Sequence, residues 1–381
     1  MQNLKIQPVS ETKIESISAI AVEVPLTYAG HYKRARKTHA CRTIVQVTSS
    51  DGIVGVGETR GTDAAPIIRD RLAPKLIDAP VDDLAQLRAT VLPNVADHGW
   101  PEQLIDFKAY AAIDMALWDS LGKRTGLPVY KLLGGSVRAE TEFAAYEYVV
   151  DPQEGVSHAD IPKAMADRAE AQINSTGARF FEFKIGVYPV DVDIATFQEV
   201  VHRLGRGVKV GIDANMSLEY HDARRLMAAA RECGIANVEE PVEALGEMDR
   251  LGREFGMPVS SHCIQLDALR AFPSITGIVC EPHNPGGMAQ VRALSEQAYG
   301  QNRKMWFRAC FELGISWAAM CHMGVAFAAM DRPTQALFNW IEDDLIEEDD
   351  FAMNGGGVRP PDRPGLGVTL DQAALKRYSI K

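Results

Sequence analysis

From Thr141 onward, short apolar segments alternate with helical stretches of roughly 10–15 residues, a pattern typical of repeated βα units. The segments that we expect to be strands span residues 141–149, 179–184, 208–213, 236–239, 258–262, 277–281, 305–310 and 336–341. Eight parallel strands within about 200 residues predict one β/α barrel, with its reactive groups at the carboxyl ends of the strands.

Three successive strand segments stop at a polar residue that suits metal binding. Residues 208–213 end at Asp213, residues 237–239 end at Glu239, and residues 258–262 end at His262. The carboxyl ends of neighbouring parallel strands meet at one edge of a barrel, so these side chains should converge. Two carboxylates and an imidazole together predict a site for a divalent cation, and hence an enzyme.

The part of the chain before the barrel has a different pattern. Residues 17–24 alternate as a strand, and residues 43–48 and 53–58 read as a hairpin joined by the turn Asp51-Gly52. Glu58 at its end is expected to be structural. Helical periodicity follows over residues 64–125, which together with the strands indicates a small α+β domain.

We therefore expect an α/β chain of two domains. Residues 1–138 would form an N-terminal α+β capping domain, and residues 139–350 the β/α barrel with its metal site. The Gly- and Pro-rich tail, residues 351–381, would fold back and complete the cap.

Composition excludes several classes of function. The net charge of −11 and the pI of about 5.4 argue against a nucleic-acid surface, which needs a basic face. The longest apolar stretch, residues 314–330, is too short to cross a bilayer and reads as a buried helix. Six scattered cysteines without a CxxC pair and an N-terminus unlike a signal peptide predict a cytoplasmic protein.

Several motifs resemble the enolase superfamily, and within it the mandelate racemase group. The segment 112–135 is similar to the one that joins that family's capping domain to its barrel. Asp213-Ala-Asn215 and Val238-Glu-Glu-Pro241 look like its first two metal-ligand motifs, and Pro364-Gly-Leu-Gly-Val368 like its tail motif. The resemblance covers the whole chain and implies the family's modified barrel and its capping domain.

The likeness extends to the glucarate dehydratase branch of acid-sugar dehydratases. In that branch the third metal ligand is an amide side chain 23 residues after the second, a spacing that here falls on His262. Glu281-Pro-His283 on the sixth strand stands where the branch has Asp-Pro-His. Three positions depart from the pattern. Glu182-Phe-Lys184 keeps only the second of two lysines, and the third ligand is a histidine, His262. The seventh-strand histidine is replaced by Glu312, or by Arg308 in a shifted alignment.

The resemblance implies a cation held by Asp213, Glu239 and His262. Mg²⁺ is expected, with Mn²⁺ or another divalent cation as the alternative because imidazole suits these ions better. As an alternative to a ligand, His262 could hydrogen-bond the substrate or simply pack. Glu240 should point to the opposite face of its strand, as an outer partner or in a structural ion pair.

Lys184 matches the retained family lysine and is our candidate for the base that removes the proton α to a carboxylate. A nearby cation would make its neutral amine accessible. The alternative is a permanently charged lysine paired with Glu182 or Asp213. Glu182 would then accept hydrogen bonds from substrate hydroxyls.

The sixth and seventh strands offer the partners of this lysine. A protonated carboxyl could deliver a proton to a departing hydroxide, and Glu312 is the first candidate and Glu281 the second. Arg308 would bind a substrate carboxylate, unless it is paired with Glu281 or Glu312. His283 is a further candidate for substrate binding.

The polar segment 27–38 is expected to be a loop over the barrel mouth, and its basic run 31–37 would select an anionic substrate. Lys33 and Arg34 in this run, with Tyr146 on the first barrel strand, are candidate substrate-binding residues. A solvated surface run is the plainer alternative for the basic residues.

The resemblance implies a metal-dependent dehydratase of a sugar acid, hexarate- or aldonate-like, that yields a 2-keto-3-deoxy acid. The same intermediate also serves racemases, epimerases and lactone cycloisomerases, and a non-catalytic homologue that binds metal and sugar acid is a further alternative. The expected partner is the small-molecule substrate, with neither nucleic acid nor membrane, and the family analogy predicts a homo-oligomer.

Overall fold

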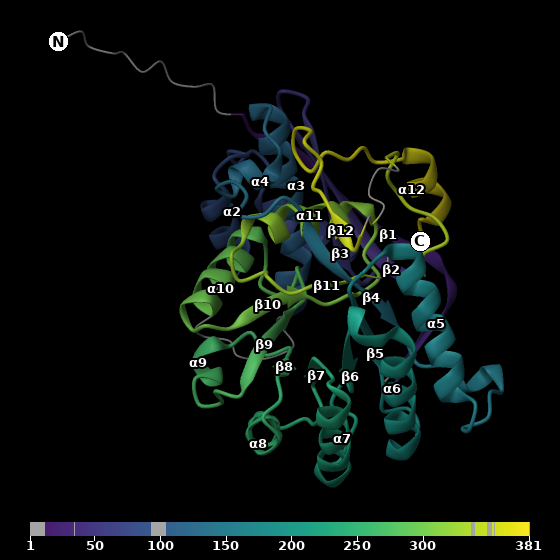
Figure 1. The fold of residues 1–381 in the computed structure, drawn as a ribbon. Coiled ribbons are helices and arrows are strands. Elements are labelled where there is room, and N and C mark those ends of the chain that lie inside the picture. The colour runs from purple at the N-terminus through teal and green to yellow at the C-terminus, as the bar shows by residue number, and fades with distance from the viewer. Residues whose placement is uncertain are drawn as a thin grey trace.

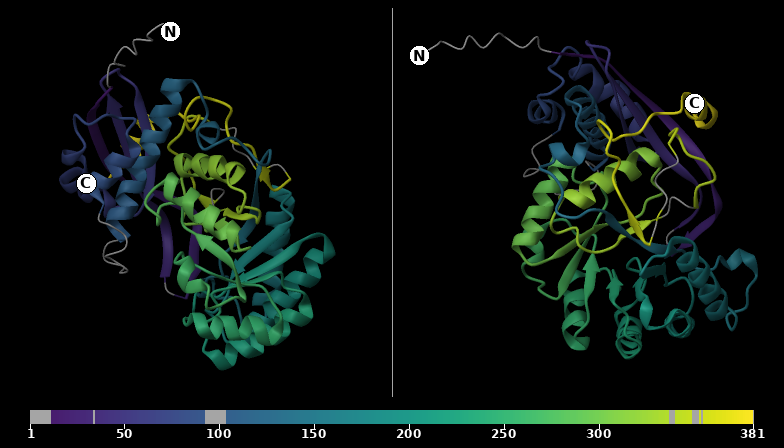
Figure 2. Two further views of the ribbon diagram at one scale, coloured as in Figure 1. Left: turned by 90° about the vertical axis from the view of Figure 1, so that its left-hand side faces the viewer. Right: turned by 45° about the horizontal axis from the view of Figure 1, so that its top comes forward.

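The computed structural model describes residues 12–33, 35–92, 104–336, 340–348, 353 and 355–380. Within these ranges the chain forms a three-stranded antiparallel sheet with helices, and a barrel-like sheet of parallel strands (Figure 1). The two parts lie side by side, and the end of the chain returns to the first part (Figure 2). The predicted fold class, a β/α barrel with an α+β cap, is confirmed.

The cap is built on the antiparallel strands β1 (Ile14–Tyr32), β2 (Ala35–Ser49) and β3 (Val54–Arg60). The predicted hairpin around Asp51-Gly52 is therefore confirmed. Its helical segments are α1 (Ala64–Ile67), a π-helical turn (Ile68–Leu72), a 3₁₀ turn (Ala73–Lys75), α2 (Leu84–Val91), α3 (Leu104–Thr125) and α4 (Val129–Leu132).

Helix α3 approaches strand β3 so closely that two strand positions must lack a side chain. A Cβ atom on Gly55 would lie 1.9 Å from the carbonyl oxygen of Ala116, and one on Gly57 would lie 2.0 Å from that of Ala112. The Gly-Val-Gly run before Glu58 therefore fixes where this helix lies on the sheet.

The segment expected to be a polar loop, residues 27–38, is instead the end of the β1–β2 ribbon. The two strands stay paired to the tip, with Gly30 opposite Lys37 and Tyr32 opposite Ala35. A register shift between Pro25 and Gly30 interrupts the ladder. The loop prediction was wrong because backbone pairing to a partner strand does not depend on side-chain polarity.

The barrel strands are β4 (Thr141–Glu147), β5 (Phe180–Lys184), β6 (Lys209–Asp213), β7 (Asn237–Glu239), β8 (Val259–Ser261), β9 (Ile275–Cys280), β10 (Lys304–Phe307) and β11 (Thr334–Ala336). They pair in parallel in the order β10-β9-β8-β7-β6-β5-β4-β11. The eighth strand lies earlier than the predicted range 336–341. Of that range, residues 337–339 lie outside the described residues.

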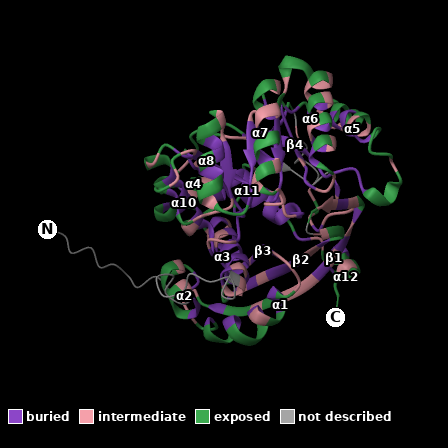
Figure 3. Ribbon diagram, turned by 90° about the horizontal axis from the view of Figure 1, so that it is seen from below, coloured by how far each residue is buried: buried purple, intermediate pink, exposed green. Residues whose placement is uncertain are grey.

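The barrel helices are α5 (Ile161–Thr176), α6 (Val190–Leu204), α7 (Tyr220–Cys233), α8 (Leu245–Phe255), α9 (Leu266–Leu269), α10 (Met288–Gly300) and α11 (Gly314–Ala326), with 3₁₀ turns at Pro152–Glu154 and Gly205–Gly207. Apart from α11, these helices have exposed residues on their outer faces, and the strands inside are buried (Figure 3).

Two barrel helices end differently. Gly234 follows α7 in the left-handed conformation, whereas α10 ends at Gly300 and the positive φ falls on Asn302. Helix α11 is buried at residues 314–325, as predicted. In the described part of the chain, no helix combines the length and the apolar character needed to cross a bilayer.

The tail connects the barrel back to the cap. Strand β12 (Gly357–Val358) pairs antiparallel with β4, and helix α12 (Gln372–Tyr378) lies beside β1. The backbone N–H of Ile380 donates to the carbonyl oxygen of Ala21 at 2.9 Å. This return places tail residues within the same hydrophobic core as the barrel.

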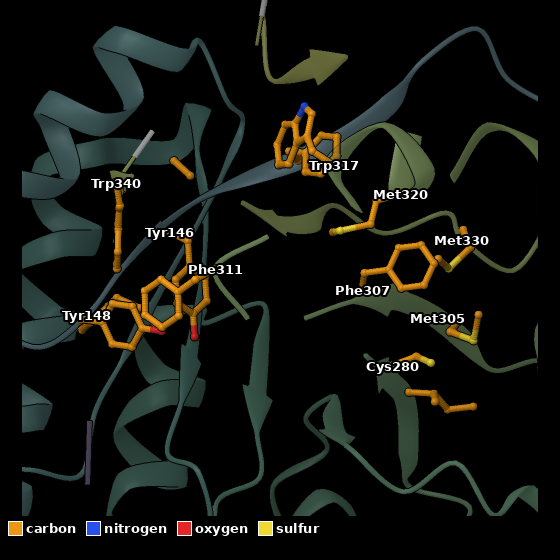
Figure 4. Packing of buried hydrophobic residues seen from close by; sticks show 14 of the residues in the cluster. Tyr146, Tyr148, Cys280, Met305, Phe307, Phe311, Trp317, Met320, Met330 and Trp340 are labelled. Carbon is orange, nitrogen blue, oxygen red and sulfur yellow. The ribbon is translucent and has the colours of Figure 1, made fainter. Parts of the chain in front are cut away.

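Aromatic side chains fill the space where the barrel meets the hairpin tip. Tyr146, Tyr148, Phe311 and Trp340 lie together, apart from the methionine-rich packing around Phe307 (Figure 4). The rings of Tyr148 and Phe311 are stacked, with centroids 5.6 Å apart. These rings form an apolar wall that excludes water from one side of the barrel mouth.

Buried polar contacts join the cap to the barrel. Arg42 donates to Glu58 at 2.5 Å, and both side chains are fully buried. The Glu58 carboxylate also accepts the backbone N–H groups of Leu313 and Ser316, at the start of α11, at 2.9 and 2.8 Å. A carboxylate at a helix N-terminus is stabilised by the free N–H groups there, so Glu58 has a structural place.

His322 on α11 joins three segments of the chain. Its Nδ1 accepts the backbone N–H of Tyr130 at 3.3 Å, and its Nε2 donates to the carbonyl oxygen of Leu366 at 3.1 Å. Burial lowers the pKa of His322 to about 4. The folded protein therefore binds fewer protons here than the unfolded chain does between about pH 4 and 6.5.

We predict that acid destabilises the protein through His322. Between pH 7 and pH 5 the wild type should lose about 2 kcal/mol of unfolding free energy that a His322→Gln variant does not lose. Urea titrations of both proteins at several pH values measure this difference. Replacing His221, an exposed histidine on α7, should leave the pH dependence unchanged, and parallel curves for His322→Gln and wild type would contradict the prediction.

Candidate active site

Lys184, Asp213 and Glu239 form a row across the ends of β5, β6 and β7. The parallel register pairs Lys184 with Asp213 and Asp213 with Glu239. Asp213 and Glu239 are fully buried, and the Lys184 side chain is 11% exposed. The structure therefore brings together the strand-end residues that the sequence singled out.

A third carboxylate lies with these two. Oxygen atoms of Glu182, Asp213 and Glu239 all lie within 4.8 Å of one another, and all three residues are buried. Burial raises the pKa of each carboxyl group, and the charge of Glu239 adds to this at Glu182 and Asp213. Three buried carboxylate oxygens this close have the chemistry of a divalent-cation site.

Lys184 is held between the carboxylate row and two aromatic rings. Its Nζ donates to Asp213 Oδ2, which also accepts the hydroxyl of Tyr146 at 3.2 Å. Its ammonium lies 5.6 Å from the ring centre of Tyr32 and 5.7 Å from that of Tyr146. The amine is thus fixed at the strand ends, and Tyr146 acts on Asp213 rather than lining the cavity described below.

Gln335 on β11 reaches the same carboxylates from the other side. Its Nε2 donates to Glu182 at 2.8 Å and to Glu239 at 3.0 Å, and its Oε1 accepts the backbone N–H of Ala309 at 3.0 Å. Sequence analysis missed Gln335 because it placed the eighth strand too late. A buried glutamine in a short strand is the signal that could have found it.

Asn215 completes the motif that begins at Asp213. Its backbone N–H donates to Asp213 Oδ1 at 2.8 Å, and its Nδ2 lies 3.4 Å from Asp213 Oδ2. The residue is 9% exposed, and its side-chain Oδ1 has no hydrogen-bond partner.

His262 follows β8 and lies between an arginine and a carboxylate. Its Nε2 is 2.8 Å from Glu239 Oε1, and its Nδ1 is 3.0 Å from Nη1 of Arg308. Burial, together with the charge of Arg308, lowers the pKa of His262 to about 4, so the imidazole is neutral at physiological pH.

Glu281, just after β9, is held between two arginines. Arg308 donates to its Oε2 at 2.5 Å and Arg60 does so at 3.1 Å. Burial alone would raise the pKa of Glu281, but Arg308, His283 and Arg60 hold it well below its ordinary value. Arg60 ends strand β3 of the cap, and nothing in the local sequence marks it as a site residue.

A cavity of about 190 Å³ opens where these groups meet the cap. Lys184, Asn215, Glu239, His262 and Arg308 line it from the barrel. Basic residues of the cap, Lys37, His39 and Arg60, line the facing side. Among the described residues that line the cavity, Glu239 is the one carboxylate, and the lysines and arginines outnumber it.

The remaining predicted site residues do not line this cavity. The Glu312 carboxylate is buried and accepts the backbone N–H of Cys310 at 2.8 and 3.0 Å. His283 is fully buried with its Nε2 3.1 Å from Ser316 Oγ. Lys33 is exposed and its charge acts on Asp193, and Arg34 lies outside the described residues.

The tip of the β1–β2 ribbon covers the cavity and is latched to the barrel. Arg36 donates to Asp151 Oδ2 at 2.6 Å, and His31 Nδ1 lies 3.3 Å from Asp151 Oδ1. A Cβ atom on Gly30 would lie 3.0 Å from the Tyr148 ring and 3.1 Å from that of Phe311. The missing side chain lets the ribbon lie directly on these rings.

Comparison with known proteins places this geometry in context. Residues 164–374 match the family Enolase C-terminal domain-like, and residues 16–134 match the Mandelate racemase / muconate lactonizing enzyme, N-terminal domain. The chain is 27% identical to a protein named "Probable glucarate dehydratase" from Streptomyces coelicolor, over 88% of this chain and 83% of that protein.

Two further similarities are informative. Muconate cycloisomerase 1-1 of Acinetobacter lwoffii is 24% identical, over 97% of each protein. The crystal structure of an enolase from Streptomyces coelicolor superposes with a TM-score of 0.88 at 28% identity, and the match covers 96% of each chain.

We predict that the Asp151 latch keeps the ribbon tip closed. An Asp151→Asn variant keeps a side chain that can cap the 3₁₀ turn at Pro152–Glu154 but loses the charge that holds Arg36. The partly exposed pair contributes about 1 kcal/mol after screening, so tryptic cleavage within residues 33–37 should be about fivefold faster. Asp70→Asn, which removes an exposed ion pair with Arg69, is the matched control. Equal cleavage rates for Asp151→Asn and wild type would rule the latch out.

Proposed function

We propose that this chain, which belongs to the enolase superfamily, is a metal-dependent dehydratase of a small sugar acid. The observation that carries the proposal is a single cavity in which Lys184 lies beside the buried carboxylates and faces the Arg60–Glu281–Arg308 group. A base, a cation site and an anion-binding wall are the parts that α-proton removal from a carboxylate requires.

Asp213 and Glu239 would hold a divalent cation at the strand ends. When bound, the cation supplies positive charge beside the substrate carboxylate, which lowers the energy of the anion formed as the α-proton leaves. Mg²⁺ suits these oxygen ligands, and Mn²⁺ is the alternative.

Lys184 is the proposed base. It takes the α-proton on Nζ, and the electron pair that remains forms the double bond as the β-hydroxyl departs. Glu312 and Glu281 were the sequence candidates for the acid that protonates this hydroxyl. Since neither lines the cavity and Glu281 is held ionised by two arginines, we propose instead that the Lys184 ammonium returns its proton to the departing hydroxide. The resulting enol then tautomerises to a 2-keto-3-deoxy acid.

The proposed substrate is a hexarate- or aldonate-like acid. The cavity volume of about 190 Å³ suits a small molecule. Arg60, Arg308 and Lys37 offer donors to carboxylate and hydroxyl oxygens, and arginine is well shaped for two-point contact with a carboxylate. The similarity to a protein named as a glucarate dehydratase supports this class.

Cycloisomerisation of a lactone is the alternative that the similarity to a muconate cycloisomerase supports. A two-base racemase or epimerase is less favoured by the geometry. Such a reaction needs a second proton acceptor across the cavity, and Arg308 offers there a guanidinium that does not give up its proton. A homologue that binds without turnover would show no 2-keto acid from any substrate.

Replacing Lys184 should abolish turnover and leave metal binding intact. We expect Lys184→Met to lower kcat by about 10²–10⁴-fold, the usual contribution of a general base. The assay is 2-keto acid formation from a panel of mono- and diacid sugars with Mg²⁺ or Mn²⁺. Lys209→Met, at the exposed start of β6, is the matched control. An unchanged kcat in Lys184→Met would exclude this lysine as the base. Absence of 2-keto acid from the wild type with every acid in the panel would exclude the dehydratase.

Replacing Arg60 should weaken the binding of diacids in particular. Loss of one charge-assisted contact at a partly exposed site is expected to raise KM for a diacid about tenfold in Arg60→Gln. The KM for a monoacid of the same length should change much less. A parallel rise for both substrates would mean that Arg60 does not contact the distal acid group.

A further inference from the structure

Glu182 is buried among the carboxylates but has no cationic partner of its own within hydrogen-bond reach. It lies on β5 two residues before Lys184, so both side chains are on the same face of the strand, and it is 2% exposed. Its oxygen lies within 4.8 Å of ligand oxygens of Asp213 and Glu239. Among the described residues, Lys184 is the one ammonium or guanidinium group that hydrogen-bonds to this cluster, and its partner is Asp213. When all three carboxylates are ionised, they and the one ammonium carry a net charge of −2, which a divalent cation would balance.

The amide of Gln335 holds Glu182 and Glu239 in place for a shared ion. Its Oε1 accepts the backbone N–H of Ala309, so its Nε2 must be the group that faces the carboxylates. This NH₂ group donates to one oxygen of Glu182 and one of Glu239. Glu182 therefore keeps its other oxygen for a ligand, whereas the other oxygen of Glu239 also faces His262 Nε2 at 2.8 Å.

Asn215 provides a second sign of an absent ligand. It lines the cavity beside Glu239, and its Oδ1 is a buried acceptor without a hydrogen-bond partner in a residue that is only 9% exposed. A buried acceptor left unpaired next to Asp213 is costly unless a cation or a water bound to it occupies the space.

His262, the third ligand expected from the sequence, is arranged as a hydrogen-bond donor. Nδ1 of His262 lies 3.0 Å from Nη1 of Arg308 and 3.3 Å from Oε2 of Glu240. The guanidinium is the nearer partner and has donors only, so we take Nδ1 as the acceptor. The imidazole proton then lies on Nε2 and is donated to Glu239 Oε1. Neither nitrogen has a free lone pair for a metal in this arrangement.

We infer that Glu182 is a ligand of the cation and that His262 is not, so that the centre consists of the three carboxylates of Glu182, Asp213 and Glu239. The inference rests on the proposed function, which requires a cation. His262 is a positioning residue that orients Glu239 and is itself oriented by Arg308. The centre is an all-oxygen site, which suits Mg²⁺ or Mn²⁺.

Binding of Mn²⁺ to the metal-free full-length protein, followed by its EPR signal without any substrate, tests this ligand set. Glu182→Gln should weaken the Mn²⁺ Kd at least tenfold, whereas His262→Gln should change it less than threefold. Glu243→Gln removes an exposed charge in the segment that follows β7 and should leave the Kd unchanged. An unchanged Kd in Glu182→Gln, or an equal loss in His262→Gln, would overturn the inference.

A measurement on the wild type avoids any effect of the substitutions on folding. Electron spin echo modulation of bound Mn²⁺ should lack the strong ¹⁴N coupling of a directly coordinated imidazole, and its presence would overturn the inference. Neither of these two experiments uses a substrate. If no acid sugar in the activity assay gave a 2-keto acid while Mn²⁺ binding was intact, the dehydratase proposal would be wrong and the ligand set would be unaffected. Loss of Mn²⁺ affinity only in His262→Gln would overturn the ligand set and leave the dehydratase proposal intact.

Discussion

The burial of several carboxylates at one end of a parallel barrel is the constraint on which the site depends. The register places Asp213 beside Glu239, and Glu182 joins them, with all three residues buried. Like charges in such a place repel, and the cost must be offset by cations and donors. Lys184, Gln335 and His262 supply these contacts from three different strands or strand ends. The arrangement of side chains at the barrel mouth therefore depends on electrostatic contacts as much as on packing.

The same logic applies where the cap meets the barrel. Glu58 is buried against Arg42 and the start of α11, and Glu281 is shared by Arg308 of the barrel and Arg60 of the cap. Removing one partner of such a group leaves an uncompensated buried charge. The two domains are therefore joined by ionic contacts that also shape the wall of the cavity, and docking of the cap and formation of the site are one event.

Local pattern predicted the barrel, the hairpin and the strand-end residues Asp213 and Glu239 because these depend on periodicity within a few residues. Gln335 was missed because the predicted eighth strand, residues 336–341, began one residue after it. Arg60 could not be found because its role arises from a contact with Glu281, far away in the sequence. The polar segment 27–38 was predicted to be a loop, but its described residues belong to β1 and β2, which pair with each other near the tip of the ribbon.

The β1–β2 ribbon runs from the cap sheet to the roof of the cavity, and its ladder has register shifts between Ile14 and Ser16 and between Pro25 and Gly30. An irregularity of this kind concentrates bending at one place, while paired strands beyond it remain stiff. The second shift lies just before the part of the ribbon that covers the cavity. The placement of the roof over the cavity therefore depends on a few backbone bonds in the cap as well as on the side chains of the site itself.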